Sequence, residues 1–429
     1  MNREILRLAI PNIISNISVP LLSTVDTALM GRLSEVHIGA VGVGAMIFNF
    51  IYWNFGFLRM GTTGLTAQAF GEENRANIIL TFVRALLVAG TLAAILLLTQ
   101  YALDPLARQL MNVGGEQGDL VKEYFLIRIW AAPASLGLFA LMGWFFGMQN
   151  AVFPLILTVS INVVNIVASY YFVAVLQWEV AGVAWGTVIA QYTGIFLGFV
   201  LFFLRYRSYW NDLVLPAILA WSALRRFLVL NMDIFLRTLC LTFVFAFFYS
   251  QSAKDGALVL AVNTILMQFL NWMSYGVDGF AFAAESVVGK YKGKKDESGT
   301  LRAIRLSFIW GMVFAVFFSA LYALGGTQIM SLFTDQENVL QAGLPYLWWM
   351  ILLPIISTPC YIWDGIFIGL TASKSMRNAM ILSLLVFVGA YFGTTTFGNN
   401  GLWLSLLIFM GARGLIQWGF FARFGLALR

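Results

Sequence analysis

Long apolar runs alternate along the chain with short stretches of glycine, proline, asparagine and charged residues. A run of about 20 mostly apolar residues is long enough to cross a bilayer, and a helix satisfies its own backbone hydrogen bonds there. Several runs are longer than a bilayer requires, so we expect those helices to tilt or to extend into water. The pattern predicts twelve transmembrane helices, over residues 5–30, 38–68, 76–101, 119–148, 152–175, 181–204, 226–250, 256–289, 301–324, 338–369, 375–397 and 401–424.

The composition supports a membrane protein and excludes other classes. Of the 429 residues, 60% are hydrophobic and only 11% are charged, whereas soluble domains have about 25% charged residues. The net charge of +6 does not indicate a nucleic-acid partner, because the basic residues lie between apolar runs and form no single face. We therefore expect the lipid bilayer, and no nucleic acid, as the surroundings of this chain.

The residue types that usually carry catalysis are scarce. Cys240 and Cys360 lie in apolar stretches without metal-ligand spacing, and His37 is the only histidine. A membrane-embedded enzyme would need a catalytic histidine, a metal cluster or a pair of facing carboxylates. The sequence therefore predicts no enzyme, no cofactor and no certain metal site.

Positive charge in the loops predicts the orientation. The first run follows basic residues as in a signal peptide, but it is too long and lacks a small-x-small cleavage site, so we interpret it as a retained first span. If the N-terminus is cytoplasmic, eighteen lysine or arginine residues lie on the inner side and four on the outer side. We expect a multi-pass protein of a bacterial cytoplasmic (inner) membrane with both termini inside.

The two halves of the sequence repeat one another weakly. An offset of six spans gives both halves the same orientation, with a pseudo-two-fold axis along the membrane normal, as in many secondary transporters. Three pairs of residues are separated by nearly the same distance along the chain: Trp53 and Trp272, Gly147 and Gly369, and Gly182 and Gly401.

This repeat predicts the domain organisation. We expect an all-α integral membrane fold with a six-helix N-lobe at residues 1–204 and a six-helix C-lobe at residues 226–429. A basic amphipathic linker at residues 205–225 joins them on the cytoplasmic side. In transporters built this way the substrate site lies between the lobes.

Ionisable residues inside spans are expensive and often functional. Asp26 lies far along the first predicted helix, where a carboxylate held away from water could exchange a proton near neutral pH. The alternative is a structural carboxylate held by serine and threonine donors. Pro11 lies fifteen residues earlier on broadly the same helix face and could permit a bend there, although prolines in membrane helices are often only packing features.

The second half has its own polar candidates. Asp278 and Glu285 are seven residues apart, hence on one face of the eighth predicted helix, and Asp364 lies in the tenth. They could take part in transport. Alternatively, they pair with Arg237 or with backbone groups and stabilise the C-lobe.

Five strings of residues, in order along the chain, resemble the multidrug and toxic compound extrusion (MATE) transporters, specifically the DinF-like branch. The resemblance implies two six-helix lobes and cation-driven export of drugs and toxins by alternating access. The strings are VDTALMGRL with a proline fifteen residues before its aspartate, GTTGLTAQAFG, DIFLRTLC, VDGFAFAAESVVGK and WDGIFIGLTASKSMRNAM.

Carried over by position, the resemblance implies that Asp26 is the coupling carboxylate and Pro11 the bend-forming proline. Asn165 and Thr187 match polar members of the same N-lobe cluster, while Ser169 stands where an aspartate is common in this branch. Sodium prefers several charged oxygens, so this departure weakens a sodium site near Asp26. We expect proton coupling, with sodium as the alternative. Asp278, Glu285 and Asp364 match the C-lobe signature of the branch.

Two further inferences concern substrate and assembly. The resemblance implies small-molecule drugs or toxins as substrates, and a self-contained twelve-helix body could act as a monomer. A lipid or lipid-linked oligosaccharide flippase is the alternative, and it would need a strongly cationic central cavity. Its candidate cations are scattered along the sequence: Arg59, Arg128, Arg237 and Arg413.

Overall fold

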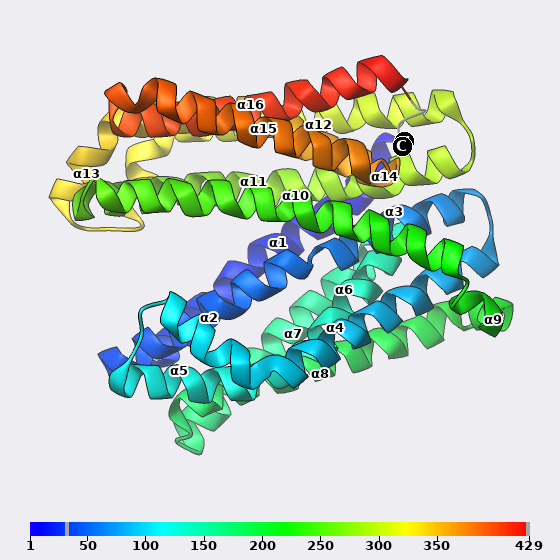
Figure 1. The fold of residues 1–429 in the computed structure, drawn as a ribbon, viewed down its shortest axis with the longest axis horizontal. Helices are drawn as coiled ribbons and strands as arrows, with labels where there is room; N and C mark the ends of the chain where they lie inside the picture. The colour runs from blue at the N-terminus through cyan, green and yellow to red at the C-terminus, as the bar shows by residue number, and fades with distance from the viewer. Residues whose placement is uncertain (31–33, 426–429) are drawn as a thin grey trace. The chain divides into compact units, whose positions relative to one another are not determined.

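The computed structural model describes the backbone of residues 1–30 and 34–425, and the side chains of residues 1–18 and 34–425. Helices joined by short turns make up this part of the chain, and no strand occurs in it. The course of the helices from the N-terminus to the C-terminus can be followed in Figure 1. The all-α class predicted from the apolar runs is confirmed.

The helices of the first half match the six runs of the first half of the sequence. Short irregular turns separate some of them, including a 3₁₀ turn at Ile129–Ala131. Their bounds are α1 (Asn2–Met30), α2 (Glu35–Phe55), α3 (Phe57–Gly71), α4 (Arg75–Leu110), α5 (Gly115–Arg128), α6 (Ala132–Gly147), α7 (Val152–Tyr170) and α8 (Glu179–Tyr206).

The second half begins after a short connecting segment. It contains a 3₁₀ turn at Leu344–Tyr346. Its helices are α9 (Leu215–Ile218), α10 (Trp221–Lys254), α11 (Ala257–Gly293), α12 (Glu297–Ser331), α13 (Glu337–Gly343), α14 (Leu347–Gly369), α15 (Ser373–Thr394) and α16 (Asn399–Phe424).

Eleven spans in the described part are long and apolar enough to cross a membrane, and α1, with 29 residues, is the twelfth long helix. Three predicted helices are interrupted: residues 38–68 at Gly56, residues 119–148 at Ile129–Ala131 and residues 338–369 at Leu344–Tyr346. Pro133 and Pro345 lie at the last two interruptions, where a residue without an N–H cannot continue the hydrogen-bond ladder. The hydropathy pattern does not detect these breaks because the residues around them remain apolar.

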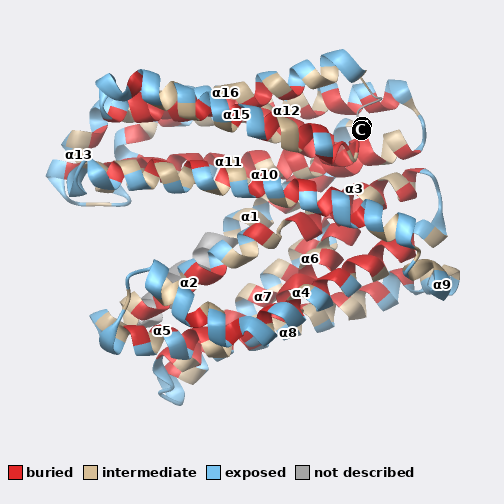
Figure 2. Cartoon of the chain, in the orientation of Figure 1, coloured by how far each residue is buried: buried red, intermediate tan, exposed pale blue. Residues whose placement is uncertain are grey.

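The chain divides into two compact units. One consists of residues 14–226, and the other of residues 1–13 together with residues 227–429. The division falls within α1, two residues after Pro11, and the position of the lobe boundaries stays a prediction. Within each unit, buried and exposed positions alternate along the helices (Figure 2), and the exposed ones include large apolar side chains such as Leu98 and Leu324. An apolar exterior is what a protein surrounded by lipid requires.

An aromatic cluster holds α4, α6 and α8 together in the first of these units. The Trp144 ring centroid lies 5.3 Å from that of Phe82, 5.2 Å from that of Phe202 and 5.0 Å from that of Tyr206. The indole N–H of Trp144 donates to the carbonyl of Ile78 at 3.0 Å, so its polar atom is also satisfied.

Glycine packing confirms the internal repeat. A Cβ atom on Gly147 would meet Thr66 and Ala67 of α3, and one on Gly369 would meet Val288 and Gly289 of α11. The spacing along the chain between the two glycines equals the spacing between their neighbours, so the same close helix crossing occurs in each half. The turns repeat too, with positive φ angles at the equally spaced pairs Glu73 and Lys295, and Gln149 and Thr371.

Candidate functional site

Three of the polar residues predicted for the N-lobe lie together between α7 and α8. Asn165 Nδ2 donates to Oγ1 of Thr187 at 3.0 Å, and Thr187 Oγ1 donates to the carbonyl of Val183 at 3.1 Å. Ser169 lies one helical turn after Asn165 and faces Gly186, whose Cβ would come within 2.8 Å of the Ser169 backbone nitrogen. The small residue on α8 therefore provides the space for this polar cluster.

The cluster has unused hydrogen-bonding capacity. Asn165 and Ser169 are fully buried, and among the described residues the Asn165 Oδ1 and Ser169 Oγ atoms have no hydrogen-bond partner. A buried polar atom without a partner costs about 1–3 kcal/mol, so such atoms usually meet a water, an ion or another side chain. The geometry suits a small polar ligand or a carboxyl group.

Helix α1 runs alongside α7 and leads toward this cluster. Ser15 Oγ donates to Thr158 Oγ1 at 2.9 Å, and Asn162 Nδ2 donates to Ser18 Oγ at 3.1 Å. Partners on the two helices are thus 143 or 144 residues apart, which means that the helices run in the same direction. Asp26 belongs to the later part of α1, and its side chain lies outside the described residues, as does any sodium site that it would form.

The other end of α1 packs within the second unit. Glu4 forms an ion pair with Lys290 of α11, and a Cβ on Gly279 of the same helix would meet the carbonyl oxygen of Ala9 at 3.0 Å. Pro11 follows directly and removes one backbone hydrogen bond from α1. The proline therefore stands close to the point where the contacts of α1 change from one unit to the other.

The C-lobe candidates Asp364 and Arg237 form an ion pair. Two further donors bind the same carboxylate: Arg413 Nη2 at 2.7 Å from Oδ2 and Gln417 Nε2 at 2.7 Å from Oδ1. All four side chains are buried, and Arg413 is only 1% exposed. They join α10, α14 and α16.

The other two C-lobe candidates lie on the neighbouring helix α11. Asp278 is near enough to Tyr275, Cys360 and Tyr361 to act on them electrostatically, which places it beside the Asp364 region of α14. Glu285 is buried two turns further along, where α11 and α14 pack closely: a Cβ on Gly369 would lie 2.8 Å from the Glu285 carbonyl oxygen.

Sequence reasoning missed some members of these networks. Gln417 was not singled out, although it lies four residues after Arg413 on one helix face and shares its partner. Asp233, the first residue of the DIFLRTLC string, is another buried carboxylate whose partners the sequence did not reveal: it accepts hydrogen bonds from Arg377 at 2.6 Å and Ser373 at 2.8 Å in the first turn of α15. That position suits an anion because the N-terminal end of a helix is electropositive.

Metal-binding chemistry is not evident in the described residues. They contain no group of three or more histidine, cysteine, aspartate or glutamate side chains placed to hold a metal ion. The one histidine, His37, instead lies 3.1 Å from Glu179 Oε2 and 2.6 Å from Ser34 Oγ, through its two ring nitrogens.

Known proteins resemble this chain over nearly its whole length. DNA damage-inducible protein F of Escherichia coli (strain K12) is 38% identical over 420 residues, which is 96% of this chain and 90% of that protein. Human Multidrug and toxin extrusion protein 1 is 24% identical over 430 residues, 95% of this chain and 72% of that protein.

Solved structures share the fold. A MOP superfamily transporter from Pyrococcus furiosus superposes with a TM-score of 0.88 and 21% identity, covering 97% of this chain and 95% of that one. A structure described as MATE in the bent conformation gives a TM-score of 0.89 and 20% identity, covering 97% and 94%. The profile of the MatE family matches residues 11–171 and 234–392. The repeat, the twelve long helices and these likenesses agree: the chain belongs to the MatE family, the multidrug and toxic compound extrusion transporters.

Proposed function

We propose that this MATE transporter exports amphipathic or cationic small molecules in exchange for protons, by alternating access, and that Asp26 is the coupling carboxylate. The observation that carries the proposal is the buried cluster of Asn165, Ser169 and Thr187, with two polar atoms that have no partner in the described part of the chain. The names of the E. coli and human relatives do not specify a coupling ion.

Helix register supports Asp26 as the missing member of the cluster. The contacts of Ser15 and Ser18 with α7 have offsets of 143 and 144 residues. The same offsets carried along two parallel helices bring position 26 to the level of Ser169. A carboxyl group there could share the free capacity of Ser169 Oγ and Asn165 Oδ1 in its protonated form, because only the protonated form can donate a hydrogen bond to an amide oxygen.

The same residues favour a proton over sodium. Sodium is a hard cation and prefers several oxygen ligands with negative charge. Around Asn165 the described residues supply amide and hydroxyl oxygens from Asn165, Ser169 and Thr187, and no carboxylate. One carboxyl group from Asp26 would be enough to bind a proton but would leave sodium with a single charged ligand.

Pro11 offers a way to couple protonation to movement. One end of α1 is bound to α11 through Glu4 and Lys290, while Ser15 and Ser18 bind α7 in the other unit. A bend near Pro11 would let the second part of α1 move with protonation while the first part stays in place. If protonation lowers the affinity for substrate, substrate binding lowers the affinity for the proton by the same factor, because the coupling between two binding sites is reciprocal.

The flippase alternative is less well supported by the side chains. Arg237 and Arg413 both bind Asp364, and the Arg59 guanidinium lies 5.9 Å from the centroid of the Phe146 ring. Arg128 binds the Tyr124 hydroxyl. These arginines are thus engaged within the protein, whereas a phosphate-binding cavity would need them to face a ligand.

The topology and assembly complete the proposal. The chain is a multi-pass membrane protein, and the excess of basic loops on one side supports a cytoplasmic location for both termini in a bacterial inner membrane. We propose that it works as a monomer, because each half already contains a complete set of six long helices.

Proteoliposomes with purified protein test the coupling ion. We expect efflux of a cationic dye to require an inward proton gradient, to dissipate that gradient, and to be unaffected by a sodium gradient. Asp26→Asn should abolish the coupled flux, and Thr187→Val should weaken it, while Asp335→Asn at an exposed outer turn serves as the control. Asp26→Asn protein that still exchanges dye for protons at the wild-type rate would refute the proposal.

A further inference from the structure

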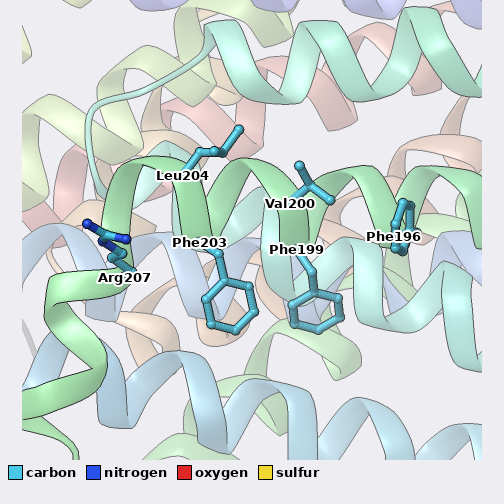
Figure 3. A pocket seen from close by; sticks show the side chains of 6 residues that line it. All are labelled: Phe196, Phe199, Val200, Phe203, Leu204 and Arg207. Carbon is cyan, nitrogen blue, oxygen red and sulfur yellow. The ribbon is translucent and has the colours of Figure 1, made fainter.

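An apolar groove runs along the outer face of α8 in the unit of residues 14–226. Six side chains line it at the helical spacing i, i+3, i+4, i+7, i+8 and i+11: Phe196, Phe199, Val200, Phe203, Leu204 and Arg207. Figure 3 shows Phe199 and Phe203 pointing to one side of the helix, Val200 and Leu204 to the other, and Arg207 at the end. The hollow has a volume of about 560 Å³ and is open to the surroundings. We infer that this groove binds one anionic phospholipid, with an acyl chain along the aromatic wall and the headgroup phosphate at Arg207.

The length of the groove suits a lipid of one leaflet. Eleven residues of helix separate Phe196 from Arg207 and span about 16 Å at 1.5 Å per residue. Half of a hydrocarbon core of about 30 Å measures about 15 Å. A single acyl chain can therefore reach from the headgroup level at Arg207 to the bilayer centre beside Phe196.

The residues around Arg207 mark the membrane–water interface. Trp210 follows Arg207 by three residues, and its ring centroid lies 6.2 Å from that of Phe203. Tryptophan prefers the headgroup level, where its ring is apolar and its N–H is hydrated. The apolar groove thus ends at the depth at which a phosphate would lie.

The charge at this end is positive. Residues 205–226 contain four arginines and one acidic residue, Asp212. Asp212 is bound by Arg75, whose Nε lies 2.7 Å from Oδ2 and whose guanidinium also stacks over Tyr209. The acid is therefore neutralised within the protein, and Arg207, which is exposed, remains available for an anionic headgroup. Zwitterionic lipids lack the net charge that this end favours.

Native mass spectrometry of the full-length protein can test the inference directly. The protein in detergent is mixed with phosphatidylglycerol or phosphatidylcholine of the same acyl chains, and the bound lipid is counted. We expect preferential retention of phosphatidylglycerol and a loss of about five-fold in its affinity in Arg207→Gln, the change that corresponds to about 1 kcal/mol for one basic residue near a membrane surface. Leu204→Trp, which fills the groove from an exposed position, should reduce retention of the lipid without altering the charge.

Arg205→Gln is the matched control, because Arg205 is exposed in the last turn of α8, two residues before Arg207, and does not line the groove. Its phosphatidylglycerol retention should equal that of the wild type. The inference is overturned if Arg207→Gln and Arg205→Gln retain the lipid equally, if both lipids are retained equally, or if inorganic phosphate displaces the lipid. It is also overturned if Leu204→Trp abolishes a protein dimer, since the groove would then bind a second copy.

Discussion

Removing the carboxylate of Asp364 should strongly destabilise the second unit. The variant Asp364→Asn keeps the size of the side chain and removes the charge that binds Arg237, Arg413 and Gln417. Both guanidinium groups are buried, so they cannot replace the carboxylate with water. Removing one partner of a buried ion pair costs about 3–5 kcal/mol.

Three donors share this one carboxylate, and their separate contributions do not add. Hydrogen bonds to charged groups contribute about 1.5–3 kcal/mol each, but the amide oxygen that remains in the variant can still accept one of them. We therefore expect the loss of the whole network to cost about 3 kcal/mol, the lower end of the range for a broken buried ion pair. This cost corresponds to a fall of roughly 10 °C in the unfolding midpoint. The measurement is thermal unfolding of the purified protein followed by tryptophan fluorescence.

Two comparisons make the result interpretable. Asp335→Asn, at an exposed turn, removes a carboxylate of equal charge and should leave the midpoint unchanged. The triple replacement of Asp364, Arg237 and Arg413 by leucine removes the whole charged group and should recover much of the loss, because apolar replacement of a complete buried ion pair is often neutral. An Asp364→Asn midpoint within about 2 °C of the wild type would refute the reasoning.

Two other predictions concern packing and pH. Gly369→Ala should destabilise the protein by about 1–3 kcal/mol and lower its unfolding midpoint, because the new Cβ would lie 2.8 Å from the Glu285 carbonyl oxygen. Gly90→Ala is the control and should not lower the midpoint, because no atom lies within 4 Å of its new Cβ. Equal midpoints for the two variants would contradict the close crossing of α11 and α14. Asp296 caps α12 by accepting from the Gly299 N–H at 2.8 Å, and this bond holds the pKa of the carboxyl below its usual range. Its stabilising effect is therefore complete above about pH 4 and is lost as the pH falls through the lowered folded-state value. Hydrogen exchange at the first turn of α12 should show this acid-induced loss in the wild type. The Asp296→Asn variant should not show it, because asparagine keeps an acceptor that does not titrate. Identical acid profiles for the two proteins would contradict the role of Asp296 as a titrating cap.

The pattern of apolar runs determines much of this fold because the bilayer leaves few alternatives. Backbone groups in lipid must be satisfied within the segment, so a run such as residues 76–101 can only form a helix, observed as α4. The repeat is visible for the same reason: Gly147 and Gly369 each allow a close crossing that a larger residue would prevent. These constraints are local: each limits which residue types can occupy a given position, whatever the distant parts of the chain contain.

Partners between distant helices depend on tertiary structure. The sequence identified Asp364 and Arg237 as ionisable residues in apolar surroundings, but 127 residues separate them, and Gln417 looks like any polar residue near the end of the last helix. Likewise, Asn165 and Thr187 came from the family resemblance, and the hydrogen bond between them follows from the packing of α7 on α8. Hydropathy says which residues are in the membrane and nothing about which helix they face.

What the sequence alone determined is the class of the protein, the number of its long helices, the repeat and most of the candidate polar residues. The tertiary structure decided which carboxylate receives two arginines, where the helices break and which buried oxygen atoms near Ser169 have no partner in the described residues. The physical reason is the distance and partner that each kind of interaction requires. Transfer into lipid acts on each segment separately, whereas ion pairing and hydrogen bonding need two atoms within about 3 Å, and only the folded chain sets that distance.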